Sequence, residues 1–251
     1  MTEIKFGLIG KNLKHSFSAS YFQTKWANEG INLYNYQLFE ITDKEEIKEF
    51  LLVHRLYLGF NITIPYKQAI LEHLGELTQE AIEIGAVNCI RNYGLVWKGH
   101  NTDGLAFLKT LELFIPLDFN GQALILGNGG SSKAVQWALK KRNISFDIVS
   151  RSSIELNYDN LTTSWNKNWK LIINTTPLGM YPDSNNFPRI PYNKIDSQCY
   201  AIDLIYNPEE TIFLRNLKEM GCKVMNGLDM LKIQADLSFN FWMEDKGIKS
   251  I

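Results

Sequence analysis

A sequence of 251 residues is long enough for one or two compact domains. Its apolar content of 45% and its charged content of 21% are ordinary for a soluble globular protein. The formal net charge of −1 offers no field that would attract nucleic acid or an acidic membrane surface. No apolar run reaches membrane-spanning length, and the N-terminal apolar run is too short for a secretory signal. These totals predict a cytoplasmic protein that binds neither nucleic acid nor membrane.

The cysteines and histidines give no pattern of a metal site. Cys89, Cys199 and Cys222 are scattered and odd in number, which argues against a disulfide scaffold and against structural zinc. The four histidines also lack metal-ligand spacing: His15, His54, His73 and His100. We therefore expect free thiols in a reducing compartment and no bound metal.

The first hundred residues predict a mixture of strands and helices. Strands are expected over 4–10, 33–39 and 57–64, the last ended by Pro65, with a hairpin formed by 86–91 and 95–98. Helices are expected over 17–29, over 43–52, and in a short segment ending at Leu74. Thr78 is expected to cap one more helix.

Beyond residue 104, strands and helices alternate. Strands are expected over 122–126, 145–149, 170–173 and 199–205, and helices over 105–113, 131–141, 209–220 and 230–242. Residues 157–168 are too polar for a convincing helix, so one crossover is expected to be irregular. Alternation of this kind predicts an α/β fold with a doubly wound parallel sheet, and a domain boundary near residue 103.

The stretch from Gly121 to Ala134 predicts a phosphate cradle. A short apolar strand is followed by the turn Gly127-Asn128-Gly129-Gly130 and by helical spacing from Ser131. Backbone N–H groups and the positive end of the helix dipole then point at whatever lies over the turn. The small residues of the dinucleotide fingerprint are Gly127, Gly129 and Ser132, although a plain glycine loop would read similarly.

The end of the next predicted strand indicates which dinucleotide binds. A NAD site has an acidic residue there to bond the ribose 2′-hydroxyl. This chain has Ser150-Arg151-Ser152-Ser153 instead, with no carboxylate. A guanidinium can hold a 2′-phosphate by paired hydrogen bonds, so the sequence predicts NADP(H).

A nicotinamide that reduces a ketone needs a substrate site and a proton donor. Three stretches are too polar to be simple turns: 14–18, 61–67 and 101–104. Their motifs, with others in the same order, resemble those of the shikimate dehydrogenase family, NADP-linked enzymes that reduce 3-dehydroshikimate. The motifs are Gly10 with Ser16-x-Ser18, Asn61-x-Thr63-x-Pro65-x-Lys67, Gly85-Ala86-Val87-Asn88, Asn101-Thr102-Asp103-Gly104, the Gly127 turn, Ser150-Arg151, Asn174-Thr175-Thr176-Pro177-x-Gly179-Met180, Asp203-x-x-Tyr206-x-Pro208 and Gly227-x-x-Met230-Leu231-x-x-Gln234-Ala235.

The resemblance covers nearly the whole chain and implies two domains. Residues 1–102 would form an α/β substrate-binding domain completed by a C-terminal helix within 228–251. Residues 103–227 would form the Rossmann-type NADP domain. The implied activity is the reversible NADP-dependent reduction of 3-dehydroshikimate to shikimate in aromatic amino acid biosynthesis.

The resemblance also implies the residues that bind substrate. Ser16 and Ser18 would hold the substrate carboxylate, and Thr63, Asn88 and Gln234 would bond its hydroxyl or carboxylate groups. Tyr206, which falls within the NADP domain, would also face the substrate. From the residues alone, a serine cap for the helix at Phe17, a backbone-bonded Asn88 and a core tyrosine are the alternatives.

Lys67 and Asp103 correspond to the family's catalytic pair. An ammonium beside the carbonyl oxygen stabilises the developing alkoxide and can supply the proton, and a carboxylate holds that ammonium in place. The sequence leaves open which of the two relays the proton, and we favour Lys67. The alternative is a surface lysine and an aspartate that caps a helix at Leu105.

The resemblance also implies which residues of the second domain contact the cofactor. Asn128, Gly129, Gly130 and Ser131 would contact the diphosphate after Gly127, and Ser150, Arg151 and Ser152 the adenosine phosphate. Thr175, Leu204, Gly227 and Met230 would surround the nicotinamide and its ribose. Two departures from the family pattern are Asn128 in place of alanine, and Ile154-Glu155 where a second basic residue often stands. The preference for NADP over NAD is therefore expected to be smaller than in family members that have the second basic residue.

Other functions remain open at this stage. A quinate/shikimate dehydrogenase would accept a broader range of substrates, and an inactive NADP-binding regulatory relative would share the fold. A folate-linked Rossmann reductase would not account for the two serines and Gln234. Monomer and homodimer are both compatible with the sequence.

Overall fold

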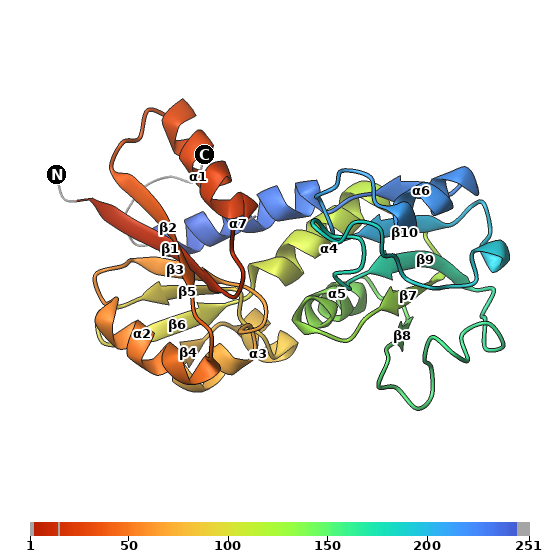
Figure 1. Ribbon diagram of the computed structural model, residues 1–251, viewed down its shortest axis with the longest axis horizontal. Helices are drawn as coiled ribbons and strands as arrows, with labels where there is room; N and C mark the ends of the chain where they lie inside the picture. Colours follow the sequence, from red (N-terminus) through yellow and green to blue (C-terminus); the bar gives the residue numbers. More distant parts are fainter. Residues whose placement is uncertain (1–2, 15, 245–251) are drawn as a thin grey trace. The chain divides into compact units, whose positions relative to one another are not determined.

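The computed structural model describes residues 3–14 and 16–244, so His15 lies outside the described residues (Figure 1). The chain forms two compact units. The first unit runs to Asp103 and resumes at Lys232, and the second unit is Gly104–Leu231. Helices α4 (Thr102–Phe114) and α7 (Leu228–Met243) each contain one of these boundaries. Within the described part of the chain, no helix is both long enough and apolar enough to cross a membrane.

The first unit contains a six-stranded mixed sheet in the order β2-β1-β3-β5-β6-β4. Its strands are β1 (Ile4–Gly10), β2 (Tyr34–Glu40), β3 (Gly59–Ile62), β4 (Glu76–Leu77), β5 (Cys89–Asn92) and β6 (Trp97–His100). Strand β1 runs parallel to β2 and β3, whereas β5 pairs antiparallel with β3 and β6. The predicted hairpin is confirmed. Strand β4 was not predicted, because two residues are too few to show a pattern.

The first unit's helices are α1 (Phe17–Asn28), α2 (Ile47–Val53), α3 (Gln79–Ile84) and the 3-10 helices η1 (Lys44–Glu46) and η2 (Ala69–His73). Side-chain caps begin α1, α3 and η1, whereas α2 and η2 have none. Thr78 caps α3, as predicted. Ser16 caps α1, which is the alternative that the residues alone offered for it. The single helix expected over 43–52 is divided: Asp43 and Glu46 form a capping box around η1, and α2 follows it.

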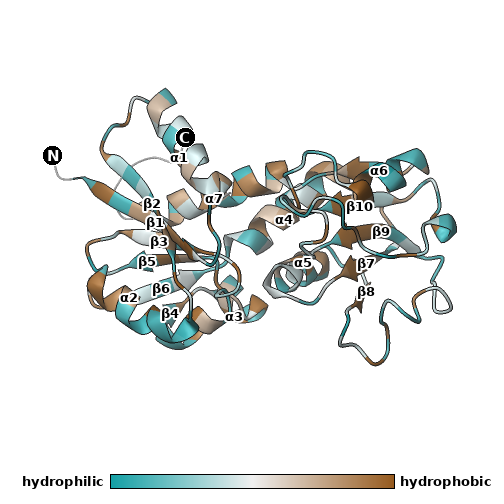
Figure 2. Cartoon of the chain, viewed as in Figure 1, coloured by the Kyte–Doolittle hydropathy of each residue, from teal (hydrophilic) through white to brown (hydrophobic). Residues whose placement is uncertain are grey.

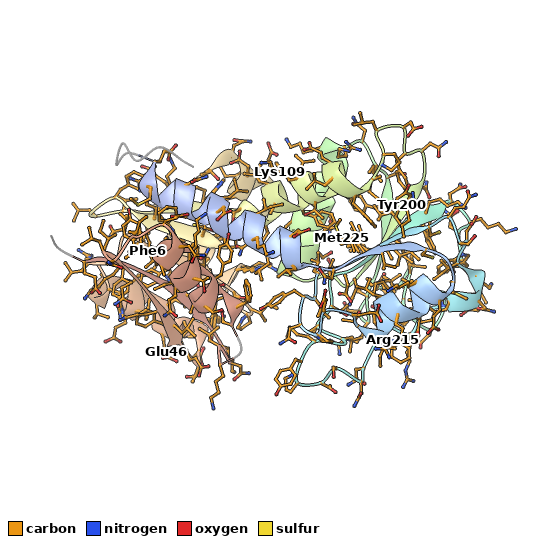
Figure 3. The ribbon with its side chains drawn as sticks, turned by 90° about the horizontal axis from the view of Figure 1, so that it is seen from above. Phe6, Glu46, Lys109, Tyr200, Arg215 and Met225 are labelled. Carbon is orange, nitrogen blue, oxygen red and sulfur yellow. The ribbon has the colours of Figure 1, made fainter. Side chains whose placement is uncertain are left out.

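Apolar side chains cover both faces of the first unit's sheet. On one face Phe6 of β1 stacks on Trp242 of α7, with ring centroids 4.8 Å apart, and Phe22 of α1 joins the same cluster. On the other face Phe60 and Phe50 belong to a second cluster. Figure 3 shows Phe6 inside the unit. Burial on both faces fixes β1 and β3, whose carboxyl ends lead to the polar stretches.

The second unit has the parallel sheet that the alternation predicted. Its strand order is β11-β10-β9-β7-β8, with every neighbouring pair parallel. The strands are β7 (Gln122–Leu126), β8 (Phe146–Val149), β9 (Trp169–Asn174), β10 (Tyr200–Asp203) and β11 (Lys223–Met225). Figure 2 shows the hydrophobic character of β7, β9 and β10. The chain reverses its direction across the sheet between β7 and β9, which is where open α/β sheets bind ligands.

Helices α5 (Gly130–Lys141) and α6 (Ile212–Glu219) and the 3-10 helix η3 (Tyr192–Lys194) accompany this sheet. Leu124 of β7 and Phe213 of α6 belong to one apolar cluster, and Arg215 points away from it on the exposed side of α6 (Figure 3). The crossover between β8 and β9 contains no helix, as predicted, and buried Leu161 anchors it. Strand β11 was missed because it is only three residues long.

Candidate active site

Lys67 and Asp103 meet in the first unit. The chain leaves β3 through a turn in which the Tyr66 N–H bonds the Thr63 carbonyl, and the Lys67 carbonyl accepts from the Val87 N–H at 2.7 Å. The Lys67 ammonium lies 2.7 Å from Asp103 Oδ2, and the two side chains are only 13% and 10% exposed. The lysine is therefore not a freely solvated surface residue. Its ammonium is largely buried and forms an ion pair with Asp103.

Asp103 lies in the first turn of α4, where the helix dipole favours a negative charge. The helix was expected to begin at Leu105, but it begins at Thr102, because Asn88 supplies a cap from another part of the sequence. Asn88 Oδ1 accepts the Thr102 N–H at 2.7 Å. Asn88 Nδ2 donates to Thr102 Oγ1 at 2.8 Å and to Asp103 Oδ1 at 2.9 Å. Both carboxylate oxygens of Asp103 therefore have a fixed donor.

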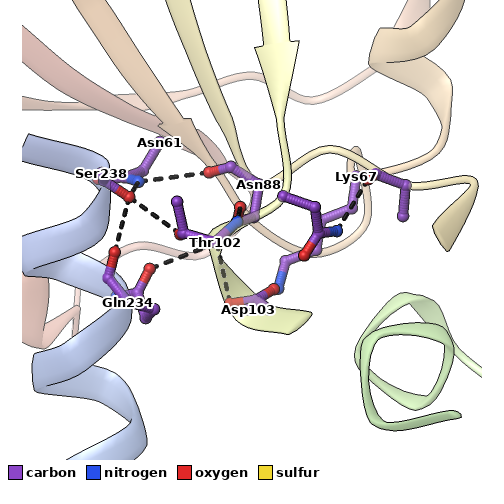
Figure 4. A network of polar contacts seen from close by, with 9 residues as sticks. Asn61, Lys67, Asn88, Thr102, Asp103, Gln234 and Ser238 are labelled. Atoms are coloured by element: carbon purple, nitrogen blue, oxygen red, sulfur yellow. Dashed lines mark hydrogen bonds and ion pairs between the residues drawn. The ribbon is translucent and has the colours of Figure 1, made fainter. Parts of the chain in front are cut away.

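Gln234 of α7 joins this group through a long contact of 3.4 Å from Asn88 Nδ2 to its Oε1 (Figure 4). Behind it lies Ser238, one helical turn later and fully buried. The Ser238 hydroxyl donates to the Gln234 carbonyl at 2.8 Å, accepts from Asn61 Nδ2 at 2.8 Å and lies 3.1 Å from Thr102 Oγ1. A continuous network of hydrogen bonds thus connects Gln234 on α7 with Asp103 on α4.

The predicted carboxylate-binding residues lie at the same edge of this sheet. Ser16 accepts the Ser18 N–H at 3.4 Å, so the helix-capping role of Ser16 is realised. The Ser18 hydroxyl bonds the Tyr36 phenol, which donates to Asn61 Oδ1 at 2.9 Å. Burial raises the pKa of Tyr36, so its hydroxyl stays protonated. Ser18 is thereby linked to the network, and half-buried Thr63 follows β3 directly.

The structure adds three residues to this edge that the sequence did not assign to a role. Asn61 and Thr102 belong to the polar stretches, so the composition of those stretches was their signal. The sequence signal for Ser238 was weak: its hydroxyl stands four residues after Gln234, on the same side of a helix. Together with the assigned residues they present one cation, one carboxylate, and neutral donors and acceptors. This chemistry suits a small polyhydroxylated acid that carries a keto group.

The glycine turn of the second unit has the geometry of a phosphate cradle. Gly127 has φ +107°, and a Cβ there would lie 2.8 Å from Thr175 Oγ1, so only glycine fits. Thr175 bonds the Leu126 carbonyl with its N–H at 3.0 Å and with its hydroxyl at 2.8 Å. A Cβ at Gly129 would meet no protein atom within 4 Å. Gly129 precedes α5 without a side-chain cap, which leaves the helix N-terminus open to a diphosphate.

The other residues predicted to contact the cofactor phosphates follow β7 and β8. Asn128 is exposed beside Gly129 and Gly130, and Ser131 is half-buried in the first turn of α5. Arg151 follows β8 and is exposed, and within residues 3–14 and 16–244 it forms no ion pair. Ser150 Oγ and Ser152 Oγ lie 3.5 Å apart on either side of it. A cation flanked by hydroxyls fits an adenosine phosphate.

The positions predicted for the nicotinamide lie in the second unit. The Gly227 N–H bonds the Ile205 carbonyl at 3.0 Å, and a Cβ on Gly227 would overlap the Leu204 carbonyl oxygen. Met230 is buried in the first turn of α7. Tyr206 is half-buried after β10, so it belongs to the second unit, whereas the other predicted substrate residues belong to the first.

One thiol, Cys89, bonds the network residue Ser238, and the other two belong to the apolar cluster of the second unit. Cys89, Cys199 and Cys222 are free and buried. Burial raises the pKa of Cys222 to about 11, so its thiol is not ionised at neutral pH. In the described part of the chain, no three His, Cys, Asp or Glu side chains gather closely enough to hold a metal ion.

Comparison with known sequences identifies the family. The profile of the shikimate dehydrogenase substrate binding domain matches residues 8–90. The NADP(+) shikimate dehydrogenase of Methanococcus maripaludis is 37% identical, over 96% of this chain and 91% of its own. The enzyme of that name from Halothermothrix orenii is 34% identical, over 94% and 89%. The chain belongs to the shikimate dehydrogenase family.

Solved structures of shikimate dehydrogenases have the same fold. A chorismate mutase/shikimate 5-dehydrogenase fusion protein from Clostridium acetobutylicum superposes with a TM-score of 0.87 at 35% identity, over 97% of this chain and 92% of that one. Shikimate 5-dehydrogenase from Thermus thermophilus, in complex with NADP(H) and shikimate, gives a TM-score of 0.82 at 30% identity, over 96% and 94%. At 97% and 96% coverage of this chain, each match extends over both units.

Proposed function

We propose that this protein is an NADP-dependent shikimate dehydrogenase, which reversibly reduces 3-dehydroshikimate to shikimate in aromatic amino acid biosynthesis. The observation that carries the proposal is the Lys67–Asp103 pair, 2.7 Å apart and bonded to Asn88, in a chain of this family. The relatives are named as NADP(+) enzymes, and the Thermus thermophilus structure contains NADP(H) and shikimate. The open glycine turn and the exposed Arg151 agree with that cofactor.

The first unit would bind the substrate through its polar edge. Ser16 and Ser18 donate to the substrate carboxylate, where each bond to a charged group contributes about 1.5–3 kcal/mol. Thr63, Asn88 and Gln234 bond the remaining hydroxyl or carboxylate groups, and Tyr206 adds a phenol from the second unit. Because Asn88 and Gln234 are already hydrogen-bonded to each other, these two side chains lose little entropy when they bind.

Lys67 and Asp103 would assist the chemistry. Bound NADPH supplies a hydride to the keto carbon. The Lys67 ammonium donates a hydrogen bond to the keto oxygen and passes a proton to it as negative charge develops there. Asp103 keeps the ammonium directed at that oxygen and accepts a hydrogen bond from a neighbouring ring hydroxyl. Lys67 then recovers its proton from solvent, so one hydride and one proton complete the alcohol.

The second unit would hold the cofactor. Gly127, Asn128, Gly129, Gly130 and Ser131 bind the diphosphate through backbone N–H groups. Ser150, Arg151 and Ser152 bind the 2′-phosphate, and Thr175, Leu204, Gly227 and Met230 enclose the nicotinamide end. A cytosolic location belongs to the same proposal, since all three cysteines are free thiols. So does a monomer or homodimer without nucleic acid.

Initial rates with shikimate and quinate, each with NADP and with NAD, test this function. We expect oxidation of shikimate with NADP to be the fastest of the four reactions, with NAD as a slower alternative cofactor. Comparable rates with quinate would instead support a quinate/shikimate dehydrogenase. The absence of any reaction, together with intact NADP binding, would support a regulatory relative.

A further inference from the structure

Asp203 is a fully buried carboxylate to which the proposed mechanism gives no task. Its exposure is 0%, and three protein donors bond it. Asn174 Nδ2 donates to its Oδ1 at 3.0 Å, the Ile205 N–H donates to the same oxygen at 3.1 Å, and the Thr211 hydroxyl donates to Oδ2 at 2.6 Å. Taking a carboxylate out of water is costly, so a group bonded this completely is expected to have a specific effect on the segments that bond it.

The place of Asp203 in the sheet indicates what that effect is. Asp203 is the last residue of β10 and pairs in register with Asn174, the last residue of β9. Asn174 in turn pairs with Leu126, the last residue of β7. These three residues form a row along the carboxyl edge of the parallel sheet. The row includes the switch point between β7 and β9, where such sheets bind their ligands.

Two of the bonds to Asp203 hold loops. Asn174 Oδ1 accepts the Thr176 N–H at 3.0 Å and the Thr176 hydroxyl at 2.7 Å, so the Asp203–Asn174 pair fixes the loop that carries Thr175. The bond from Ile205 fixes the loop that carries Leu204, and the Ile205 carbonyl accepts the Gly227 N–H at 3.0 Å.

The third bond holds the start of a helix. The Thr211 hydroxyl, which donates to Asp203 Oδ2, also caps α6 by accepting the Leu214 N–H at 3.3 Å. Asp203 therefore connects the loops after β9 and β10 with the N-terminus of α6, all within the second unit.

We propose that Asp203 is a positioning residue for the nicotinamide half of the cofactor. Its two carboxylate oxygens hold the loops after β9 and β10 so that Thr175, Leu204 and Gly227 form one surface for the nicotinamide and its ribose. The inference rests on the proposed NADP-binding function. It does not extend to the adenosine half, whose predicted contacts follow β8 and are not bonded to Asp203.

Two substitutions separate the geometry of these bonds from the charge. Asp203→Asn keeps an oxygen at the Oδ1 position for Asn174 and Ile205, and its amide can donate to Thr211 once the Thr211 hydroxyl turns. Asp203→Ala removes all three bonds. If the loops are positioned by hydrogen bonding, asparagine restores most of what alanine loses.

Calorimetric titration with two ligands tests the proposal. NADP⁺ reaches both halves of the site, whereas adenosine 2′,5′-bisphosphate lacks the nicotinamide and its ribose. We expect Asp203→Ala to raise the Kd for NADP⁺ roughly tenfold or more, which corresponds to at least about 1.4 kcal/mol. The Kd for adenosine 2′,5′-bisphosphate should change less than about twofold, and Asp203→Asn should stay within about threefold of wild type for both ligands.

A matched control is Asp147→Ala. Asp147 accepts the Trp169 indole N–H at 2.7 Å at the amino end of β9, so it is a bonded carboxylate of the same sheet that lies away from the carboxyl edge. Its loss should leave both affinities unchanged.

The outcomes distinguish the inference from the function on which it rests. Equal weakening of both ligands by Asp203→Ala, or unchanged NADP⁺ affinity, would overturn the positioning role alone. A selective loss in Asp203→Asn as large as in Asp203→Ala would overturn the hydrogen-bonding explanation. Failure of the wild-type protein to bind either ligand would overturn the proposed function, and the inference with it.

Discussion

The polar edges of the two units are built differently. In the first unit, Lys67, Asn88 and Asp103 are polar or charged side chains that meet from distant parts of the sequence and bond one another. In the second unit, the Gly127 turn and the open start of α5 offer backbone groups with few side chains over them. The difference suggests a division of tasks. A reacting keto group needs charges fixed in place, whereas a diphosphate needs free N–H groups and room.

Removing the ammonium should have the largest effect. Lys67→Ala is expected to cut turnover ~10²–10⁴-fold, because the developing charge on the keto oxygen loses its stabilising cation and its proton donor. Affinity for NADP should change little, since the backbone cradle is intact. Lys98→Ala is the matched control: Lys98 is a lysine of the same unit, 30% exposed and 3.9 Å from Glu76. Steady-state kinetics measure the turnover of each variant, and titration with NADP measures its affinity for the cofactor. Near-normal turnover in Lys67→Ala would refute the catalytic role.

The backbone turn is tested next. Gly127→Ala forces a side chain into φ +107° and against Thr175 Oγ1, a strain of about 1–3 kcal/mol. If the free turn relaxes to avoid this strain and NADP binding has to restore the cradle conformation, the KM for NADP should rise roughly ten- to a hundredfold while the KM for shikimate changes little. Gly94→Ala is the control, since Gly94 also has a positive φ but no protein atom within 4 Å of its Cβ position. If both substitutions affect the NADP KM equally, the turn is not the cradle.

A single side chain of the second unit is expected to set the cofactor preference. Arg151→Asp should lower the kcat/KM for NADP about ten- to a hundredfold and raise it for NAD, because the 2′-phosphate loses a charged partner. The ratio of kcat/KM values for the two cofactors measures the effect. Arg189→Asp makes the same charge change at an exposed residue of the same unit. An unchanged ratio in Arg151→Asp would contradict the assignment of Arg151.

The smallest expected effect is one of stability. Burial raises the pKa of Asp203 to about 7, although its three donors oppose the shift. The folded state therefore holds this proton more tightly than the unfolded state, whose aspartate pKa is about 3.9. The contribution of Asp203 to the free energy of unfolding is thus greatest below about pH 4 and is lost as the pH rises to about 7.

Urea unfolding between pH 4 and pH 8 measures this contribution as a difference. Asp203→Asn should have a flatter profile than wild type over this range, because its side chain does not titrate. Asp203 also influences the pKa of Tyr192, but burial raises that pKa well above the usual value for tyrosine, so Tyr192 does not titrate in this range. Parallel profiles for the two proteins would show that Asp203 does not titrate as described.

The sequence predicted those features that depend on neighbouring residues. The cap at Thr78, the strand before Gly127 and the helix after it all follow from local spacing, and the structure confirms them. The missing helix between β8 and β9 was predicted in the same way, from a polar stretch around Asn160. The motifs also indicated the family, which the comparisons confirm. The roles assigned to single site residues remain predictions.

Features that depend on distant contacts could not be predicted. The start of α4 at Thr102 depends on Asn88, fourteen residues earlier. The three bonds at Ser238 involve α7, β3 and α4, which no local pattern connects. Asp203 looked like part of a motif, but only the sheet register places it beside Asn174. Strands as short as β4 carry too few residues for any periodicity.

The most direct test of the central claim is the fate of the hydride. A single turnover of 3-dehydroshikimate with excess enzyme, and with NADPH deuterated at both hydrogens of nicotinamide C4, should yield shikimate that carries one deuterium at the former keto carbon. Mass spectrometry of the product would show it. Unlabelled shikimate, or oxidised cofactor without shikimate, would contradict the proposed reaction.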